Sequence, residues 1–164
     1  MQTTQTTQTE NETRNNLELS PALYLIKKYE GFSSKPYLCP AGVWTIGYGN
    51  TKYLNGLPVR KNDPEISKQE AEELLENTVK EEFLPGLLEL SPHLKNHHFK
   101  LNALLSFCYN LGLGAYSKST LRKKVDAKQW DDAAEQFMRW VNAGGKKLNA
   151  LVKRRAEEAS IFMR

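Results

Sequence analysis

Residues 32–60 have a β-type pattern, whereas the segments on both sides of them have helical patterns. The strongest strand signal is the run 43–48, Val-Trp-Thr-Ile-Gly-Tyr, and Pro40-Ala41-Gly42 supplies turn residues before it. Asn55-Gly56 is a second hairpin signal. One short β segment between helices predicts an α+β fold, in which a small antiparallel sheet is segregated from the helices.

Helices are predicted directly before and after the β segment. Ser20-Pro21 is typical of an N-cap followed by proline in the first turn, and Gly31 is a typical helix stop. Ser67 and Glu70 form a capping box that opens a second helix, which runs to about residue 83 and is stopped by Pro85. This second helix is long enough to connect two lobes.

Beyond residue 85 almost every segment predicts a helix. Apolar residues recur at helical spacing in the segments 101–108, 121–125, 133–141 and 148–163, and Ser119 is a candidate cap for the second of these. Phe137 and Met138 belong to the apolar face of the third segment, which Gly144-Gly145 is predicted to stop.

The predicted organisation is a polar tail followed by one domain. Residues 1–16 contain no large apolar residue beyond the first Met and predict disorder. The domain over residues 17–164 comprises an N-terminal helix with a β lobe (17–66), a connecting helix (67–84) and a helical lobe (85–164).

Size and composition exclude several classes of protein. The chain has 164 residues, too few for two independent enzyme domains, and no apolar run approaches the roughly 18 residues of a membrane span. The N-terminal residues show no secretory signal pattern. Two cysteines are too few for a disulfide framework, and His93, His97 and His98 lack acidic or cysteine neighbours, so neither a metal nor a cofactor is expected.

Charge is distributed unevenly along the chain. Residues 1–90 contain 9 Lys and Arg against 13 Asp and Glu, a net charge of −4, while residues 91–164 contain 14 against 6, a net charge of +8. A polycationic half attracts nucleic acid, anionic lipid or an acidic cell-wall polymer alike, and ordinary solubilising lysines give the same pattern. No nucleic-acid-binding motif accompanies the charge, so no nucleic-acid partner is expected.

Glu30 is the first candidate for catalysis on chemical grounds. It falls in the last turn of the first predicted helix, where the negative end of the helix dipole disfavours an ionised carboxylate. A carboxyl group that keeps its proton is what a general acid needs. An exposed Glu paired with Lys27 is the structural alternative. The following segment is rich in aromatic residues, which suit a sugar-binding surface as well as a core.

The order of these residues resembles that of the phage-type lysozymes. The first half contributes Glu30-Gly31, Tyr37, Cys39, Gly42 and the run Thr45-Ile46-Gly47-Tyr48-Gly49-Asn50-Thr51. The second half contributes Ala103-Leu104, Ser106-Phe107, Tyr109-Asn110, Gly112, Gly114-Ala115-Tyr116, Ser119-Thr120-Leu121, Arg139-Trp140, Ala143-Gly144-Gly145-Lys146 and Arg154-Arg155-Ala156-Glu157. Together the matches cover residues 20–164.

The resemblance implies a lysozyme-like fold with an active-site cleft between the two lobes. Its catalytic positions fall on Glu30, Cys39 and Thr45, and its cleft-lining positions fall on Thr51, Tyr109, Asn110, Ser119 and Thr120. It implies that Glu30 acts as the general acid in cleavage of the β-1,4 bond between N-acetylmuramic acid and N-acetylglucosamine in bacterial peptidoglycan. It also implies a monomer that stays in the cytoplasm until a separate holin-type protein releases it onto the cell wall.

Two positions depart from the family pattern. Cys39 stands where the family has a catalytic Asp, as in a subset of lambdoid-type endolysins, and Asn50 stands where His is usual. No Asp or Glu occurs between Glu30 and Asp63, so no local carboxylate replaces the missing one. A free thiol has a pKa of about 8.5 and a neighbouring carboxylate raises it, so Cys39 is predicted to be mainly neutral.

Several roles remain open for the cysteine and for the protein. Cys39 is a water-positioning group, a base, a nucleophile or a packing residue. A lytic transglycosylase that uses Glu30 alone, and a weakened protein that only binds peptidoglycan, are alternatives to hydrolysis. Arg154 and Arg155 are candidates to place a guanidinium group beside Glu30, although a solvated basic helix face is the expectation for at least one of them.

Overall fold

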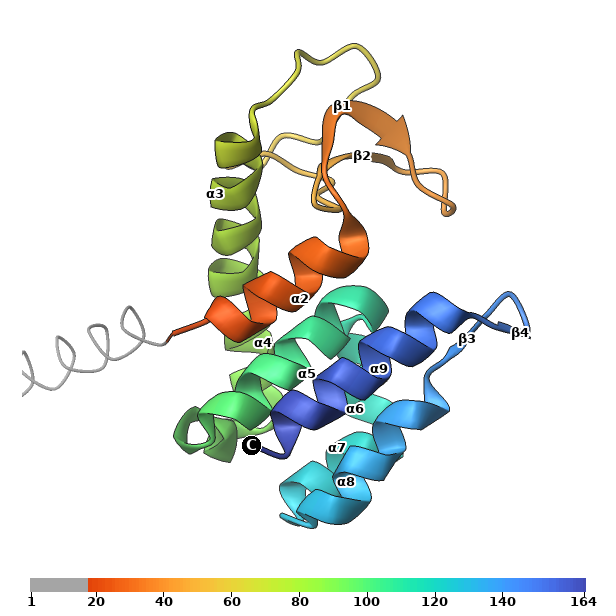
Figure 1. Ribbon diagram of the computed structural model, residues 1–164. Helices are drawn as coiled ribbons and strands as arrows, with labels where there is room; N and C mark the ends of the chain where they lie inside the picture. Colours follow the sequence, from red (N-terminus) through yellow and green to blue (C-terminus); the bar gives the residue numbers. More distant parts are fainter. Residues whose placement is uncertain (1–17) are drawn as a thin grey trace, which may run out of the picture.

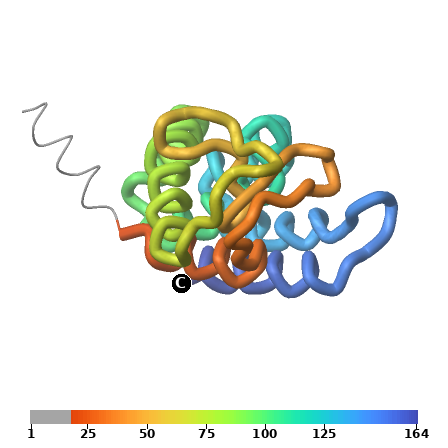
Figure 2. Tube along the Cα trace, turned by 90° about the horizontal axis from the view of Figure 1, so that it is seen from above, coloured from red at the N-terminus to blue at the C-terminus, as the bar shows by residue number. Residues whose placement is uncertain are grey.

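A computed structural model describes residues 18–164, and the tail predicted over residues 1–16 lies outside the described residues (Figure 1). The hairpin of β1 (Ser33–Leu38) and β2 (Trp44–Gly47) and the loop after it form one lobe, and the later helices form the other. Seen from above, the orange and yellow β lobe lies over the green and blue helical lobe (Figure 2). The predicted α+β architecture, with a small sheet-bearing lobe beside a helical lobe, is therefore confirmed.

The first helix ends at the candidate general acid. α2 spans Ser20–Glu30, and Gly31 follows it with a φ of +70°, a left-handed conformation that glycine adopts without strain. The prediction of Ser20 as N-cap is wrong, because Leu19 occupies that position and no side chain of the helix's own end caps it. Asn102 of the later helix α5 (His98–Leu111) takes over this function, since its Oδ1 accepts a hydrogen bond from the backbone N–H of Ala22 at 3.1 Å.

The β lobe is built on one antiparallel hairpin. β1 spans Ser33–Leu38 and β2 spans Trp44–Gly47, with Tyr37 opposite Thr45 in the register. The predicted turn closes through a hydrogen bond from the Gly42 N–H to the Cys39 carbonyl oxygen at 2.8 Å. The second predicted hairpin is present as a bridge that pairs residues 52 and 58 around Asn55-Gly56. The register brings Thr45 and Cys39 to the same end of the hairpin.

The connecting helix does not stop at Pro85. α3 spans Lys68–Thr78 and begins with the predicted capping box of Ser67 and Glu70. A π-helical turn, η1 (Val79–Phe83), follows it directly, and α4 (Leu84–Leu90) continues the helical path with Pro85 in its first turn. The predicted stop is wrong because the wider π turn changes the hydrogen-bond pattern just before the proline, at a position where a missing N–H is tolerated.

The helical lobe surrounds a buried central helix. Its elements are η2 (Pro92–Asn96), α5 (His98–Leu111), α6 (Leu113–Lys118), α7 (Thr120–Asp126), α8 (Trp130–Gln136), η3 (Phe137–Arg139), β3 (Asn142–Ala143), β4 (Lys146–Lys147) and α9 (Asn149–Phe162). Every residue of α5 from Leu101 to Cys108 is buried, and the helix packs against both α2 and α9. No helix among residues 18–164 is long and apolar enough to cross a membrane.

The third predicted helical segment ends earlier than expected. The chain leaves α8 at Gln136, passes through the 3₁₀ turn η3, and forms the small hairpin of β3 and β4, whose turn is made by Gly144 and Gly145. Met138 is 40% exposed and does not belong to the core, which corrects its predicted place on the apolar face. The tighter 3₁₀ turn rotates this side chain away from the helical stripe.

The two helix starts offer a matched test of capping. We expect Ser67→Ala to lower the free energy of unfolding by about 1 kcal/mol, because Ser67 accepts a hydrogen bond from the Glu70 N–H. Ser20→Ala should change it by much less, since Ser20 caps nothing. Urea denaturation of both variants measures the difference, and equal losses would contradict the assignment of the caps.

Candidate active site

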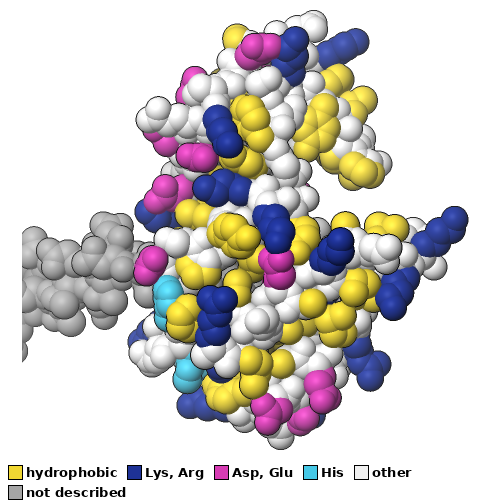
Figure 3. Space-filling model, in the orientation of Figure 1, with side chains coloured by type: hydrophobic (Ala, Val, Ile, Leu, Met, Phe, Trp, Pro, Cys, Tyr) yellow, Lys and Arg dark blue, Asp and Glu magenta, His cyan; other side chains and the backbone are white. Residues whose placement is uncertain are grey.

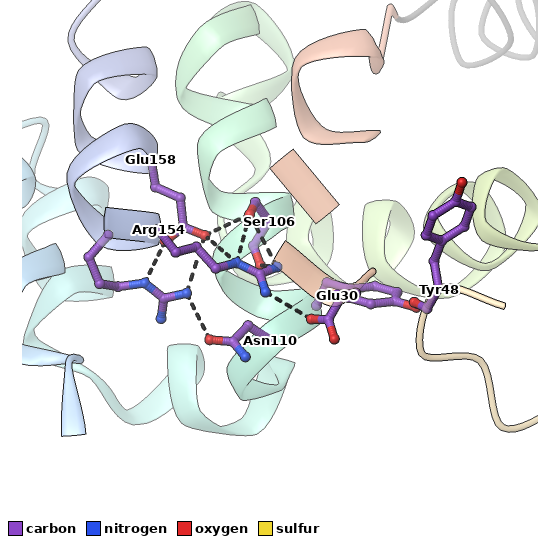
Figure 4. Close-up of polar contacts among 8 residues, drawn as sticks. Glu30, Tyr48, Ser106, Asn110, Arg154 and Glu158 are labelled. Carbon is purple, nitrogen blue, oxygen red and sulfur yellow. Dashed lines mark hydrogen bonds and ion pairs between the residues drawn. The ribbon is translucent and has the colours of Figure 1, made fainter. Parts of the chain in front are cut away.

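Glu30 is held by an arginine from the last helix of the chain. Nη1 of Arg154 in α9 lies 2.8 Å from Oε1 of Glu30, across 124 positions of sequence. The Arg154 side chain is 3% exposed and that of Glu30 is 25% exposed, so the pair joins the interior to the surface (Figure 4). Arg154 and Arg155 are both buried, which corrects the expectation that one of them lies on a solvated helix face.

The second oxygen of Glu30 faces the end of the β lobe. Gly49 has a φ of +87°, and a Cβ placed on it would lie 3.4 Å from Oε2 of Glu30 and 3.4 Å from the hydroxyl of Tyr109. That hydroxyl donates a hydrogen bond to the carbonyl oxygen of Tyr48 at 2.5 Å, and burial raises the pKa of Tyr109, which keeps the donor protonated. The ends of α2, β2 and α5 therefore meet at the carboxyl group of Glu30.

Cys39 and Thr45 form a second polar group at the turn of the hairpin. Backbone hydrogen bonds from the turn, with Val43 first, hold the pKa of the Cys39 thiol below its ordinary value, and the Thr45 hydroxyl contributes in the same direction. The predicted upward shift is thus wrong, because the turn supplies donors that favour the thiolate. The Thr45 hydroxyl also donates a hydrogen bond to the Val43 carbonyl oxygen, with Oγ1 at 2.9 Å, so the Cys39 sulfur and this carbonyl compete for its single proton.

Tyr37, which the family resemblance includes without a catalytic or cleft-lining role, lies near both Glu30 and Cys39. Burial raises its pKa, and the charges of Glu30 and Cys39 raise it further, so the phenol lies within electrostatic reach of both groups. Its place opposite Thr45 in the hairpin register explains this position. In the sequence, its signal is an aromatic residue two positions before Cys39.

Two of the predicted cleft residues share a pocket beside Gly49. The pocket has a volume of about 180 Å³ and is lined by Gly49, Asn50, Thr51, Lys52, Thr78, Glu82, Phe83 and Tyr109. Asn50, which stands in the place of the usual His, is buried, and its Nδ2 donates a hydrogen bond to the Thr78 hydroxyl at 2.9 Å. This amide therefore ties the β lobe to the connecting helix.

The remaining predicted cleft residues lie at helix ends. The amide oxygen of Asn110 accepts a hydrogen bond from Nη2 of Arg155 at 2.8 Å. Ser119 is buried, and its hydroxyl caps α7 by accepting from the Arg122 N–H while donating to the Tyr116 carbonyl oxygen. Thr120 is exposed at the first position of α7. Of these three, Ser119 has its hydroxyl fully engaged within the helical lobe.

The surface is hollowed between the two lobes. Figure 3 shows this hollow on the side where the hairpin of β1 and β2 overhangs the helical lobe. Cys39 and Cys108 are free thiols, and Cys108 is buried in α5. Among residues 18–164, no group of three or more His, Cys, Asp or Glu side chains is placed to hold a metal ion.

Two lobes joined by a helix, with a carboxyl group at the junction, define a lysozyme-like protein. The sequence model of the phage lysozyme family matches residues 27–158. The endolysin of Acyrthosiphon pisum secondary endosymbiont phage 1 is 35% identical over 144 residues, which cover 85% of this chain and 93% of that protein. This chain belongs to the phage lysozyme family.

Two further relatives align with most of this chain. The endolysin of Bacillus phage B103 is 38% identical over 141 residues, and the match covers 85% of this chain but 51% of that longer protein. The solved structure of an endolysin from Escherichia coli O157:H7 phage FAHEc1 has a TM-score of 0.74 at 31% identity, covering 90% of this chain and 94% of that one. The fold is thus shared over nearly the whole described length.

Gly49 provides a test of the geometry around Glu30. We expect Gly49→Ala to lower cleavage of peptidoglycan roughly 10-fold to 100-fold, because the added Cβ would lie in van der Waals contact with Oε2 of Glu30 and the Tyr109 hydroxyl and fill the space beside the free oxygen of Glu30. Gly56→Ala is the matched control, since Gly56 has a similar φ of +82° and nothing within 4 Å of the added Cβ. Initial rates on purified cell walls, with thermal unfolding of both variants, measure the effect. Equal activity in the two variants would contradict this geometry.

Proposed function

We propose that this protein is an endolysin that hydrolyses the β-1,4 bond between N-acetylmuramic acid and N-acetylglucosamine in peptidoglycan, with Glu30 as the general acid. The observation that carries the proposal is the placement of Glu30, whose Oε1 is fixed by Arg154 while Oε2 faces Gly49 and the pocket beside it. Relatives that are named endolysins support the same activity. Membership of the phage lysozyme family also supports lysis of peptidoglycan as the general activity.

Glu30 is suited to deliver a proton to a leaving oxygen. Its carboxyl group is partly buried, and one oxygen is occupied by a charged hydrogen bond that fixes its orientation. The free oxygen then carries the proton toward the glycosidic oxygen as the bond to the anomeric carbon breaks. Fixed orientation matters because proton transfer requires the donor and acceptor atoms to be within hydrogen-bond reach.

Cys39 and Thr45 are suited to position the attacking water. Water adds to the anomeric carbon, its surplus proton passes to the Cys39 thiolate or to solvent, and direct attack inverts the anomeric configuration. The lowered pKa of Cys39 supports this role because it enlarges the thiolate fraction. Asp63, the first carboxylate after Glu30 in the sequence, instead accepts hydrogen bonds from the Tyr53 hydroxyl and the Arg60 N–H, each at 2.8 Å.

The lack of a nearby second carboxylate in the sequence favours one alternative reaction. In a lytic transglycosylase the muramic 6-hydroxyl attacks the anomeric carbon, so the reaction needs Glu30 but no positioned water. The products differ in mass by one water per cut from those of hydrolysis. A protein that only binds peptidoglycan would give no products at all.

We infer that the protein acts as a monomer, accumulates in the cytoplasm of the producing bacterium, and depends on a separate holin-type protein to reach the cell wall. The exposed Lys146 and Lys147 of β4 suit an acidic polymer such as peptidoglycan with its carboxylate-bearing peptides. No nucleic-acid partner is part of the proposal.

Product analysis tests the reaction and the role of Glu30 together. We expect purified protein to release fragments from peptidoglycan that have gained one water per cut, and Glu30→Gln to lower the rate by roughly 10²-fold to 10⁴-fold because it removes the proton donor. Mass spectrometry of the fragments measures both. Anhydro-muramic ends would establish the transglycosylase instead, and no fragments from the folded parent would leave binding alone.

Substitutions of Cys39 test how the water is handled. We expect Cys39→Ala to lower the hydrolysis rate roughly 10-fold to 100-fold and Cys39→Asp to retain most of it, because a carboxylate restores a base at the same place. Rates on soluble peptidoglycan strands, measured beside thermal unfolding, give the comparison. Full activity of Cys39→Ala would reduce Cys39 to a packing residue.

A further inference from the structure

A buried polar cluster lies behind the arginine that holds Glu30. It consists of Ser106 in α5 and of Arg154, Arg155 and Glu158 in α9, and we call it the buried arginine cluster (Figure 4). Arg155 and Glu158 have side chains that are 0% exposed, and Arg154 is 3% exposed. Charged groups are rarely buried so completely without a partner, so the contacts within this cluster define what the charges do.

Glu158 is shared between the two arginines. Its Oε2 lies 3.4 Å from Nε of Arg154, and its Oε1 lies 2.7 Å from Nε of Arg155. Burial raises the pKa of Glu158, and the charges of Arg155 and Arg154 together with the Ser106 hydroxyl act in the opposite direction. Glu158 is therefore the buried counter-ion of both guanidinium groups, while Glu30 is the partner of Arg154 at the surface.

Ser106 links the counter-ion to Arg154. Its hydroxyl donates to Oε2 of Glu158 at 2.6 Å and accepts from Nε and Nη2 of Arg154, each at 3.4 Å. Its carbonyl oxygen accepts from Nη2 of Arg154 at 3.1 Å. Because the guanidinium group is planar and rigid, contacts on Nε and Nη2 also fix the direction of Nη1, which is the atom that holds Glu30.

We propose that Glu158 and Ser106 are positioning residues for bond cleavage, which act by holding Arg154 so that its Nη1 fixes the carboxyl group of Glu30. Arg155 extends the same arrangement to the cleft, since its Nη2 contacts both Glu158 at 3.3 Å and the amide oxygen of Asn110 at 2.8 Å. One buried carboxylate thereby orients both Glu30 and Asn110. This inference rests on the proposed function for its kinetic consequences.

The neighbouring residue Glu157 supplies a matched control. It lies on the same helix, one position before Glu158, and it also forms an ion pair, in its case with Lys28 of α2 at the surface. Glu157→Gln makes the same chemical change as Glu158→Gln, a carboxylate replaced by a neutral amide. It leaves the buried arginine cluster intact. A difference between the two variants therefore reports on the cluster and not on the charge of α9.

The kinetic experiment compares Glu158→Gln, Ser106→Ala and Glu157→Gln on soluble peptidoglycan strands. We expect kcat to fall roughly tenfold or more in Glu158→Gln and less in Ser106→Ala, with KM nearly unchanged, because the substrate-contacting surface is kept while Glu30 loses its orientation. Glu157→Gln should keep the parent kcat. Ser106→Ala keeps every charge, so it preserves the test if Glu158→Gln fails to fold.

A double mutant separates positioning from general stability. If Glu158 acts through Arg154, Glu158→Gln should cost little further kcat in a chain that already carries Arg154→Lys, whereas independent effects multiply. Multiplied losses in the double mutant, or a parent-like kcat in Glu158→Gln and Ser106→Ala, would overturn the proposal.

Nuclear magnetic resonance tests the positioning without any enzymatic readout. The Nε–H signal of Arg154, assigned by its loss in Arg154→Lys, should exchange with water roughly tenfold faster in Glu158→Gln and Ser106→Ala than in the parent or in Glu157→Gln. Unchanged exchange would overturn the proposal even if the parent cleaves peptidoglycan. A parent that folds but cleaves nothing would defeat the proposed function, while the exchange rates would still decide whether Glu158 and Ser106 hold Arg154.

Discussion

The ion pair between Arg154 and Glu30 is the contact on which the arrangement of the site depends. Glu30 ends α2, where the helix dipole is unfavourable to a carboxylate, and the guanidinium group of Arg154 offsets this by coming from a different helix. The pair joins the start of the domain to its last helix. The carboxyl group of Glu30 is therefore held in a fixed orientation only because folding brings the last helix of the chain to the end of the first.

The central helix α5 gives the pair its surroundings. Ser106, Tyr109 and Asn110 are spaced at i, i+3 and i+4, so they lie on one face of the helix. Each makes a different contact at the site: Ser106 with Arg154, Tyr109 with the backbone of the β lobe, and Asn110 with Arg155. The apolar residues of α5 between Leu101 and Cys108 are buried in the core, which makes this helix a rigid support for the polar face.

The irregular connecting helix also contributes to the site. The π turn η1 places Phe83 against the ring of Tyr109, with the ring centroids 5.2 Å apart, at the edge of the pocket beside Gly49. Asn50 and Thr78 join the β lobe to the same helix one turn earlier. A regular helix across Val79–Phe83 would rotate these side chains relative to one another, so the π turn sets how the pocket is lined.

Local sequence signals determined several elements of this protein, and the tertiary structure decided where others end and how the charges are used. Glu30 at a helix end, the hairpin turn before Val43 and the capping box at Ser67 follow from residue chemistry within a few positions, and the structure has all three. The burial of Glu158 and both arginines, and the lowered pKa of Cys39, depend on donors and acceptors that meet only after folding. Sequence patterns report neighbours along the chain, whereas electrostatic partners are neighbours in space.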